Sequence, residues 1–165
     1  MNPTLYTTID SPIGELLLTG DGQVLSRLSM QHGRHPIAID PRWHRRDEPF
    51  ENVRRQLDEY FDGTRRAFEV PLRMEGNSFE IRVWRALREI PYGETVSYGQ
   101  IAGEIRQPGA ARAVGLANGR NPVAVIVPCH RVIGADGSLT GYGGGLARKQ
   151  LLLDLEAGLI PLQVA

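Results

Sequence analysis

Cysteine is almost absent from this chain, because Cys129 is the only one among 165 residues. A single cysteine excludes an intrachain disulfide and a cysteine-rich zinc site. The lack of disulfides is typical of a reducing compartment, so we expect a cytoplasmic location. The chain also lacks an apolar run near the roughly 18–20 residues of a membrane span. Its N-terminal MNPTLYTTID has neither a basic region nor an apolar signal core, so we expect no membrane association.

Lysine is nearly absent, and acidic residues are absent from one long segment. Lys149 is the only lysine, so arginine carries almost all the positive charge, and its planar guanidinium suits bidentate contact with phosphate. Residues Ile105–Ala135 include no Asp or Glu and carry a charge of about +4. The net charge of the whole chain is zero, which argues against a strongly basic nucleic-acid binder. Chance clustering of arginine is an alternative explanation of the segment. The arginines in it are Arg106, Arg112, Arg120 and Arg131.

The N-terminal part alternates short β-prone runs with turn residues. These runs predict two or three antiparallel strands, at Leu5–Ile9, Glu15–Thr19 and Val24–Met30. Residues 32–49 have no hydrophobic period and are predicted to form a loop. The following PFENVRRQLDEYFDG has apolar residues at helical spacing and ends at Gly63, which predicts a helix. After it, AFEVPLRM is predicted to be a further extended segment.

Three of the four histidines, His32, His35 and His44, lie in the predicted loop. Their spacing matches no standard metal site, and no thiol is nearby. We therefore expect exposed histidines, no bound metal and no cofactor.

A domain boundary is predicted near RMEGNS, and it divides the chain into residues 1–76 and 77–165. Ser78 is predicted to cap a helix through FEIRVWRALREI, which Pro91 would end. Ser97 is predicted to cap a second helix, in TVSYGQIAGEI.

The turn RQPG leads from the second helix to a third, AARAVGLANG, which Gly119 would end. Two short helices joined by a tight turn resemble a helix-turn-helix. Arg112 would project from a face of small side chains, which lets a helix approach DNA closely. Helix–helix packing through alanines explains the same residues equally well. The small residues are Ala110, Ala111, Ala113 and Gly115.

The single cysteine follows VAVIV, a β-branched run that predicts a buried strand ending at Cys129. Pro128 would fix the approach, and His130 with Arg131 would provide a positive setting that lowers the pKa of the thiol. Neighbouring residues of a strand point to opposite faces, so Cys129 and His130 would couple only through a turn or a bridging water. A small buried hydrophobic residue is the alternative role for a lone cysteine.

A third group should orient the histidine if it acts as a base. Glu156 is a candidate, because it ends the amphipathic helix predicted for LARKQLLLDLE, after the glycine-rich GADGSLTGYGGG. A carboxylate at the C-terminal end of a helix is disfavoured by the helix dipole and therefore indicates a specific partner. An ordinary surface glutamate is the alternative.

Three stretches of the chain closely resemble one family. PYGETVSYGQIA, AARAVGLANGRNPVAVIVPCHRVIG and GYGGGLARKQLLLDLE are similar to the O6-alkylguanine-DNA alkyltransferases, or methylated-DNA–protein-cysteine methyltransferases. The resemblance is dense from about Phe79 to Glu156 and loose before it, through TIDSPIG and LDEYFDG. It implies irreversible transfer of one alkyl group from the O6 atom of guanine, and by extension the O4 atom of thymine, to the protein's own cysteine.

The resemblance implies catalytic roles for four residues. Cys129 matches the acceptor thiolate, His130 the water-linked base, and Glu156 the carboxylate that orients this base. Asn121 matches the asparagine that braces the turn between the recognition helix and the active site.

The resemblance also implies a base pocket and a DNA-binding helix. Tyr98 matches the tyrosine that crowds the 3′ phosphate and donates to the base, and the carbonyls of Val132 and Cys129 match acceptors for the guanine amino group. Tyr142 and Gly143 match the lid, where many members have serine in place of this glycine. Arg112 matches the arginine that enters the stack in place of the flipped base, on the helix that carries Ala110, Ala111, Ala113 and Gly115.

The family fold is α/β, with a small ribonuclease-H-like N-terminal domain and a helical C-terminal domain that contains a winged helix-turn-helix. Members with a zinc ion hold it with N-terminal cysteines, which are absent here, so the resemblance also implies no metal. Double-stranded DNA containing O6-alkylguanine is the implied partner. We expect a monomer in solution and leave cooperative assembly on DNA open.

Two other functions fit parts of the same sequence. A cysteine hydrolase would use Cys129 and His130 with turnover, and a non-enzymatic winged-helix DNA binder would keep the cysteine for structure. The number of alkyl groups transferred per chain separates the three: one, many or none.

Overall fold

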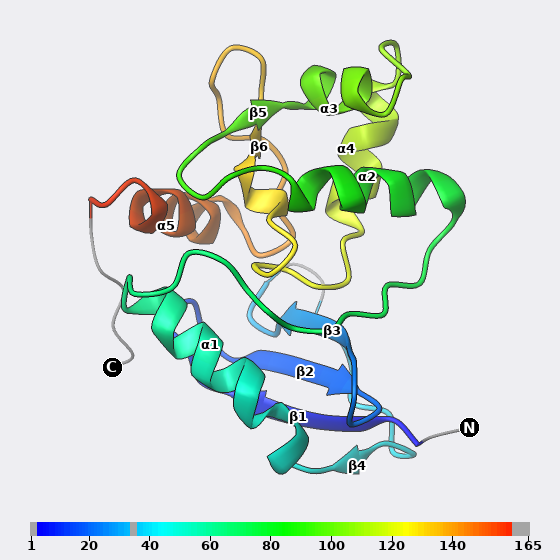
Figure 1. Cartoon of the computed structure of the whole chain (residues 1–165), viewed down its shortest axis with the longest axis vertical. Coiled ribbons are helices and arrows are strands. Elements are labelled where there is room, and N and C mark those ends of the chain that lie inside the picture. The colour runs from blue at the N-terminus through cyan, green and yellow to red at the C-terminus, as the bar shows by residue number, and fades with distance from the viewer. Residues whose placement is uncertain (1–2, 34–35, 160–165) are drawn as a thin grey trace.

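A computed structural model of the chain describes residues 3–33 and 36–159. A four-stranded sheet with one long helix forms the N-terminal half, and a helical unit forms the C-terminal half (Figure 1). The α/β class and the two-part architecture predicted from the sequence are confirmed. None of the helices in the described part of the chain has the length and apolarity that crossing a bilayer requires.

The N-terminal sheet contains β1 (Leu5–Ile9), β2 (Leu16–Gly20), β3 (Leu25–Met30) and β4 (His44–Arg45). Its order is β3-β2-β1-β4; β1–β2 and β2–β3 are antiparallel, and β4 is parallel to β1. The three predicted strands are confirmed to within one residue at each end. The prediction of a continuous loop over residues 32–49 was wrong at β4, because two exposed residues leave no hydrophobic pattern to detect. His32 and His44 are exposed as expected, and His35 lies outside the described residues.

Helix α1 (Glu51–Phe61) follows the short 3-10 turn η1 (Glu48–Phe50) and covers one side of the sheet (Figure 1). Its buried face has the helical spacing seen in the sequence. The helix ends before Gly63, whose φ of 86° is a left-handed conformation that glycine adopts without strain. The buried residues of α1 are Val53, Gln56, Leu57, Tyr60 and Phe61.

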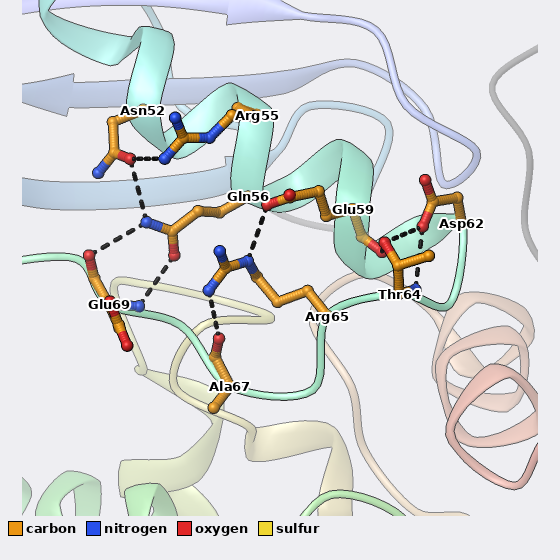
Figure 2. Close-up of polar contacts among 9 residues, drawn as sticks. All are labelled: Asn52, Arg55, Gln56, Glu59, Asp62, Thr64, Arg65, Ala67 and Glu69. Carbon is orange, nitrogen blue, oxygen red and sulfur yellow. Dashed lines mark hydrogen bonds and ion pairs between the residues drawn. The ribbon is translucent and has the colours of Figure 1, made fainter.

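Gln56 explains why a polar residue belongs to this buried face. Its side chain makes two hydrogen bonds with the backbone of Glu69, from Nε2 to the carbonyl at 3.1 Å and from the Glu69 N–H to Oε1 at 2.9 Å. Figure 2 shows this pair together with Arg65, which reaches Glu59 and the carbonyl of Ala67. These contacts fold the segment after α1 back along the helix. This segment was predicted to be extended, and it contains no helix and a single bridge to the sheet, at Leu72.

The C-terminal half contains α2 (Ser78–Arg88), α3 (Tyr98–Glu104), α4 (Ala111–Gly119) and α5 (Leu146–Glu156). All four helices were predicted from the sequence. The predicted cap of α2 was wrong by one residue: Asn77, not Ser78, accepts from the backbone N–H of Glu80 at 2.8 Å. The Glu80 side chain accepts from the Asn77 N–H in return, which completes a capping box.

Helices α3 and α4 form the predicted helix-turn-helix. Ser97 caps α3 by accepting from the Gln100 N–H at 3.1 Å, as predicted. The turn between the helices contains Arg106 at a φ of 63°. A short parallel pair, β5 (Val96–Ser97) and β6 (Val132–Ile133), joins the start of α3 to the segment after Cys129.

The VAVIV segment is not a strand, so this prediction was wrong. Val123 makes a single bridge to Leu28, and the chain then turns, with the Val127 N–H donating to the Val123 carbonyl at 3.0 Å. Val125 has a φ of 69°, which is rare for a β-branched residue. The valines are fully buried, and a buried turn has the same apolar pattern as a buried strand.

Candidate active site

Cys129 begins a 3-10 turn, η2 (Cys129–Arg131), directly after Pro128. The Cys129 N–H donates to the Val127 carbonyl at 2.8 Å, which tightens the approach to the turn. Cys129 and His130 are both buried, with exposed fractions of 5% and 0%. In a strand, Cys129 and His130 would point to opposite faces and could not interact. In this turn, successive side chains are not restricted in that way.

Asn121 holds the chain that leads to this turn. Its Nδ2 donates to the Val127 carbonyl at 2.8 Å, and its Oδ1 accepts from the Val123 N–H at 3.0 Å. The two bonds join the start and the end of the VAVIV turn. The position of Cys129 therefore depends on this one amide.

Glu156, at the end of α5, accepts hydrogen bonds from three side chains. Tyr60 Oη donates at 2.6 Å, His130 Nε2 at 2.7 Å, and Arg131 Nε at 2.7 Å with a second bond from Nη2 at 3.0 Å. Both the carboxylate and the His130 ring are almost completely buried. The sequence predicted a specific partner for this helix-end carboxylate, and the structure places His130 against it.

The charge state of Glu156 fixes the tautomer of His130. Burial alone would raise the pKa of Glu156, but the hydrogen bonds from His130 and Arg131 outweigh it and lower the pKa from 4.5 to about 2. An ionised carboxylate only accepts, so Nε2 of His130 carries the proton that it donates. The other ring nitrogen, Nδ1, then has a free lone pair, and it has no hydrogen-bond partner in the described part of the chain.

The thiol is less acidic than the sequence predicted. Burial raises the pKa of Cys129 above its ordinary value, although the Asn121 amide and the Lys149 charge oppose this shift. Arg131 does not provide the expected positive setting, because its guanidinium contacts Glu156 and the Ile90 carbonyl. Burial also lowers the pKa of His130. The resting pair is therefore a thiol and a neutral imidazole, which is a base that accepts a proton.

A cavity of about 200 Å³ opens beside Cys129. Asn118, Asn121, Tyr142 and Gly143 line it together with Cys129, and residues of β3 close its other side. The resemblance implies that Tyr142 and Gly143 form a lid over the base, and in the structure both line this cavity with Cys129. A Cβ placed on Gly143 meets no atom within 4 Å, so a serine fits there sterically.

Val132 and Tyr98 do not line this cavity. Val132 is linked through Lys149 to Thr140, and Tyr98 contacts Thr140 directly. The Val132 carbonyl accepts from Lys149 Nζ at 2.6 Å, and the same Nζ donates to the Thr140 carbonyl at 2.9 Å. Tyr98 Oη lies 3.1 Å from Thr140 Oγ1. The buried Lys149 therefore links β6 to the loop that leads to Tyr142.

Strand β3 of the N-terminal half contacts two segments that form the site. In β3, the Leu28 N–H donates to the Pro122 carbonyl at 2.9 Å, and the Leu28 carbonyl accepts from the Ala124 N–H at 3.1 Å. Gly144 packs so closely against Met30 that a Cβ would lie 2.2 Å from its sulfur. Both the VAVIV turn and the Tyr142 loop are therefore held by the same strand.

Arg112 lies on the exposed face of α4, as predicted from the sequence. Ala113 beside it is also exposed, and Leu116 one turn later has an exposed fraction of 65%. Ala110, Ala111 and Gly115 are half-buried, and a Cβ on Gly115 would lie 3.8 Å from the Tyr98 ring. The small residues are therefore compatible with both explanations. On the inner side they allow close packing between helices, and on the outer side they allow close approach to DNA.

Sequence reasoning missed three residues that shape the site. Lys149 precedes Glu156 by seven residues on the same face of α5, and Asn118 follows the buried Val114 by four residues on α4. A polar residue on the apolar face of a helix was the available signal in both cases. Tyr60 donates from α1 to Glu156 across 96 residues of sequence, and no local pattern indicates such a contact.

We expect the free energy of unfolding to fall on acidification, in two steps. The pKa of His130 is lowered on folding, so its contribution is complete above its ordinary value of 6.5 and is lost as the pH falls below it. The pKa of Glu156 is also lowered, from 4.5 to about 2. At about 1.4 kcal/mol per pH unit, Glu156 contributes about 3 kcal/mol to the free energy of unfolding, and this contribution is lost as the pH falls from 4.5 to about 2. Urea unfolding measured from pH 7 to pH 3 tests this, and a flat profile would contradict it.

Two family models match the chain. The 6-O-methylguanine DNA methyltransferase ribonuclease-like domain matches residues 4–74, and the DNA binding domain of the same name matches residues 78–158. A methylated-DNA–protein-cysteine methyltransferase of Mycobacterium tuberculosis is 55% identical over 94% of each chain. One from Methanosarcina acetivorans is 52% identical over 92% of this chain and 97% of its own length.

Solved structures give the same answer. The crystal structure of Mycobacterium tuberculosis OGT in complex with DNA is 54% identical, covers 95% of each chain and superposes with a TM-score of 0.89. The two family models together match both halves of the chain, and the second includes the turn that holds Cys129. The chain therefore belongs to the 6-O-methylguanine DNA methyltransferases, which repair DNA by direct transfer of an alkyl group to their own cysteine.

Proposed function

We propose that Cys129 accepts the alkyl group from the O6 atom of guanine in duplex DNA, once and irreversibly. His130 Nδ1 takes the thiol proton through a bridging water, and the thiolate sulfur attacks the alkyl carbon. The carbon–O6 bond breaks, and its electron pair stays on the guanine. The proton then passes from His130 to the guanine. The products are an S-alkyl cysteine and an unmodified guanine. A thioether is a stable product, so each chain acts once.

The observation that carries this proposal is the chain of contacts from Glu156 through His130 to the turn that holds Cys129. The ionised carboxylate keeps the proton on Nε2 and leaves the lone pair of Nδ1 free. Burial lowers the pKa of His130 and raises that of the Cys129 thiol, and the bond from Glu156 opposes the first of these shifts, so it keeps the imidazole a better base than burial alone would leave it. The bond from Asn121 to the Val127 carbonyl, and the place of Cys129 among the residues that line the cavity, support the same proposal.

DNA is proposed to bind along α4, with the lesion flipped out of the duplex into the cavity. An enzyme cannot reach the O6 atom within the stack, and flipping costs a few kcal/mol. The exposed Arg112 is the side chain proposed to fill the vacated position from the minor groove. The small residues of α4 around it would let the helix approach the DNA closely. Tyr98 and the Tyr142 loop are proposed to hold the base and its phosphate.

Other parts of the proposal follow from the same chemistry. We propose that residues 77–165 bind and repair DNA while residues 1–76 support the site, and that the protein acts as a monomer. A cytoplasmic location keeps a lone thiol reduced. The O4 atom of thymine is proposed as a second, weaker target.

Mass spectrometry of the intact protein after incubation with O6-methylguanine duplexes tests the proposed function. We expect a mass gain of one methyl group, located on the peptide with Cys129, and no second addition with excess DNA. Turnover beyond one equivalent would indicate a hydrolase, and an unmodified protein that binds DNA would indicate a non-enzymatic binder.

Arg112→Ala is expected to slow repair of paired duplexes. The activation free energy should rise by at most the few kcal/mol that base flipping costs. Reaction with a mispaired lesion should be slowed less, because the base is already loosened, and reaction with the free alkylated base should not change. Single-turnover rates at saturating DNA measure all three. Equal losses for paired and mispaired duplexes would assign Arg112 to phosphate contact alone.

A further inference from the structure

Buried polar atoms without partners gather around Cys129. Within residues 3–33 and 36–159 three such side-chain atoms are found: Asn118 Oδ1, His130 Nδ1 and Tyr142 Oη. Buried polar groups are almost always paired in folded proteins, so each of these atoms requires an explanation. The transfer step uses His130 Nδ1. Asn118 and Tyr142 remain, and both line the cavity beside Cys129.

The orientation of the Asn118 amide is fixed by its neighbour. Asn118 is 3% exposed, on the inner face of α4, and its Nδ2 donates to the Cys129 carbonyl at 3.3 Å. A carbonyl only accepts, so the nitrogen of the amide must face Cys129. The oxygen is therefore the free end of a side chain that lines the cavity, and it is a hydrogen-bond acceptor without a partner.

An O6-alkylated guanine offers this acceptor one donor group. Alkylation of O6 leaves N1 without a proton, so the ring nitrogens only accept, and the exocyclic 2-amino group is the single N–H donor of the base. An O4-alkylated thymine has lost its N3 proton in the same way and has no donor at all. A free acceptor in the cavity therefore distinguishes the two lesions by chemistry.

The backbone acceptors near the cysteine already have partners. The Cys129 carbonyl accepts from Asn118 Nδ2, and the Val132 carbonyl accepts from Lys149 Nζ at 2.6 Å. The resemblance implies that these carbonyls bind the guanine amino group. Each of these carbonyls keeps a second lone pair, and Asn118 Oδ1, on the amide that binds the first of them, is the acceptor with no partner at all.

We propose that Asn118 Oδ1 accepts a hydrogen bond from the 2-amino group of the alkylated guanine and gives the protein its preference for guanine over thymine lesions. The inference rests on the proposed function, because it adds a contact to the same substrate. A lesion without the amino group leaves the buried oxygen unpaired, and the loss of one such hydrogen bond corresponds to about a tenfold change in rate.

The first test uses the wild-type protein and three duplexes that differ only in the lesion. These contain O6-methylguanine, O6-methylhypoxanthine, which lacks only the 2-amino group, or O4-methylthymine. Single-turnover rates at saturating DNA should be about tenfold lower for hypoxanthine than for guanine, and thymine should react at least as slowly as hypoxanthine. Equal rates for guanine and hypoxanthine would overturn the inference.

The second test uses Asn118→Leu, which removes the acceptor at a similar side-chain size. Loss of the Nδ2 bond to the Cys129 carbonyl should slow repair of both lesions equally, whereas loss of the acceptor should slow repair of O6-methylguanine about tenfold more than repair of the hypoxanthine lesion, so that their ratio approaches one. Asn52→Leu makes the same exchange on the exposed face of α1 and should leave the wild-type ratio unchanged. A wild-type ratio in Asn118→Leu would show that another group reads the amino group.

The total alkyl transferred per chain keeps these results interpretable. A variant that folds poorly lowers this amplitude, whereas the ratio of rates within the active fraction is unaffected. Failure of the proposed function is a different result, because the wild-type protein would then take no methyl group from O6-methylguanine at all.

Discussion

Cys129→Ser should bind alkylated duplex DNA as tightly as the wild-type protein and transfer no measurable alkyl group. Serine has nearly the shape of cysteine, so the buried turn should fold unchanged. Its hydroxyl is a much weaker nucleophile, and neutral His130 is not basic enough to ionise it. The loss should be several orders of magnitude, on the scale of about 10⁶ seen when an enzyme nucleophile is removed. Intact-protein mass and DNA binding by gel shift measure the two properties.

The wild-type chain has one cysteine, so the variant has no other thiol to alkylate. Thermal unfolding of the variant controls for damage to the site. A methyl group found on Cys129→Ser at a rate near that of the wild type would refute the nucleophile assignment. Loss of DNA binding in a folded variant would indicate that the thiol supports the DNA surface instead.

The elements that sequence predicted well are those in which local pattern and burial agree. Helix α5 was predicted over its exact span because apolar residues recur at helical spacing between a glycine-rich turn and the chain end. Strand β1 was predicted in the same way, from a short β-prone run between turn residues. In both elements turn residues precede or follow the run, so its bounds can be found in the sequence itself.

The segment before Cys129 shows where this reasoning fails. VAVIV is buried on all sides, so its composition carries no period, and the Asn121 bonds that make it a turn depend on tertiary contact. The same limit applies to the charge of the site. Arg131 is only two residues from Cys129 in sequence, but its guanidinium is directed to Glu156, which is brought near by the packing of α5.

The family resemblance predicted the role of each matching residue but not its environment. It grouped Glu156 with His130, and the structure adds Tyr60 and Arg131 to the same carboxylate. The helix that carries Glu156 and the helix that carries Tyr60 belong to opposite halves of the chain (Figure 1). The carboxylate therefore joins the two halves as well as orienting the base.

This double role changes what removal of the carboxylate should do. Glu156→Gln retains the size of the side chain but removes the charge that pairs with the buried Arg131. Breaking a buried ion pair on one side costs about 3–5 kcal/mol, because the other charge stays in a poorly solvated place. We expect the free energy of unfolding to fall by that amount at pH 7, measured by urea unfolding. The exposed Glu89→Gln is the control for loss of a surface charge and should change it little.

The rate of transfer should fall as well, by about 10–100-fold in the folded fraction, as for other groups that orient a catalytic histidine. Glu156 raises the pKa of His130 against the effect of burial, so a neutral amide leaves a weaker base. Tyr60→Phe separates the two roles, because it removes one hydrogen bond to Glu156 and keeps both the charge and the contact with His130. That variant should lose about 1 kcal/mol of stability and react at nearly the wild-type rate. Single-turnover rates from pH 6 to 9 decide the matter: if folded Glu156→Gln matches the wild-type protein throughout, the carboxylate only joins the two halves.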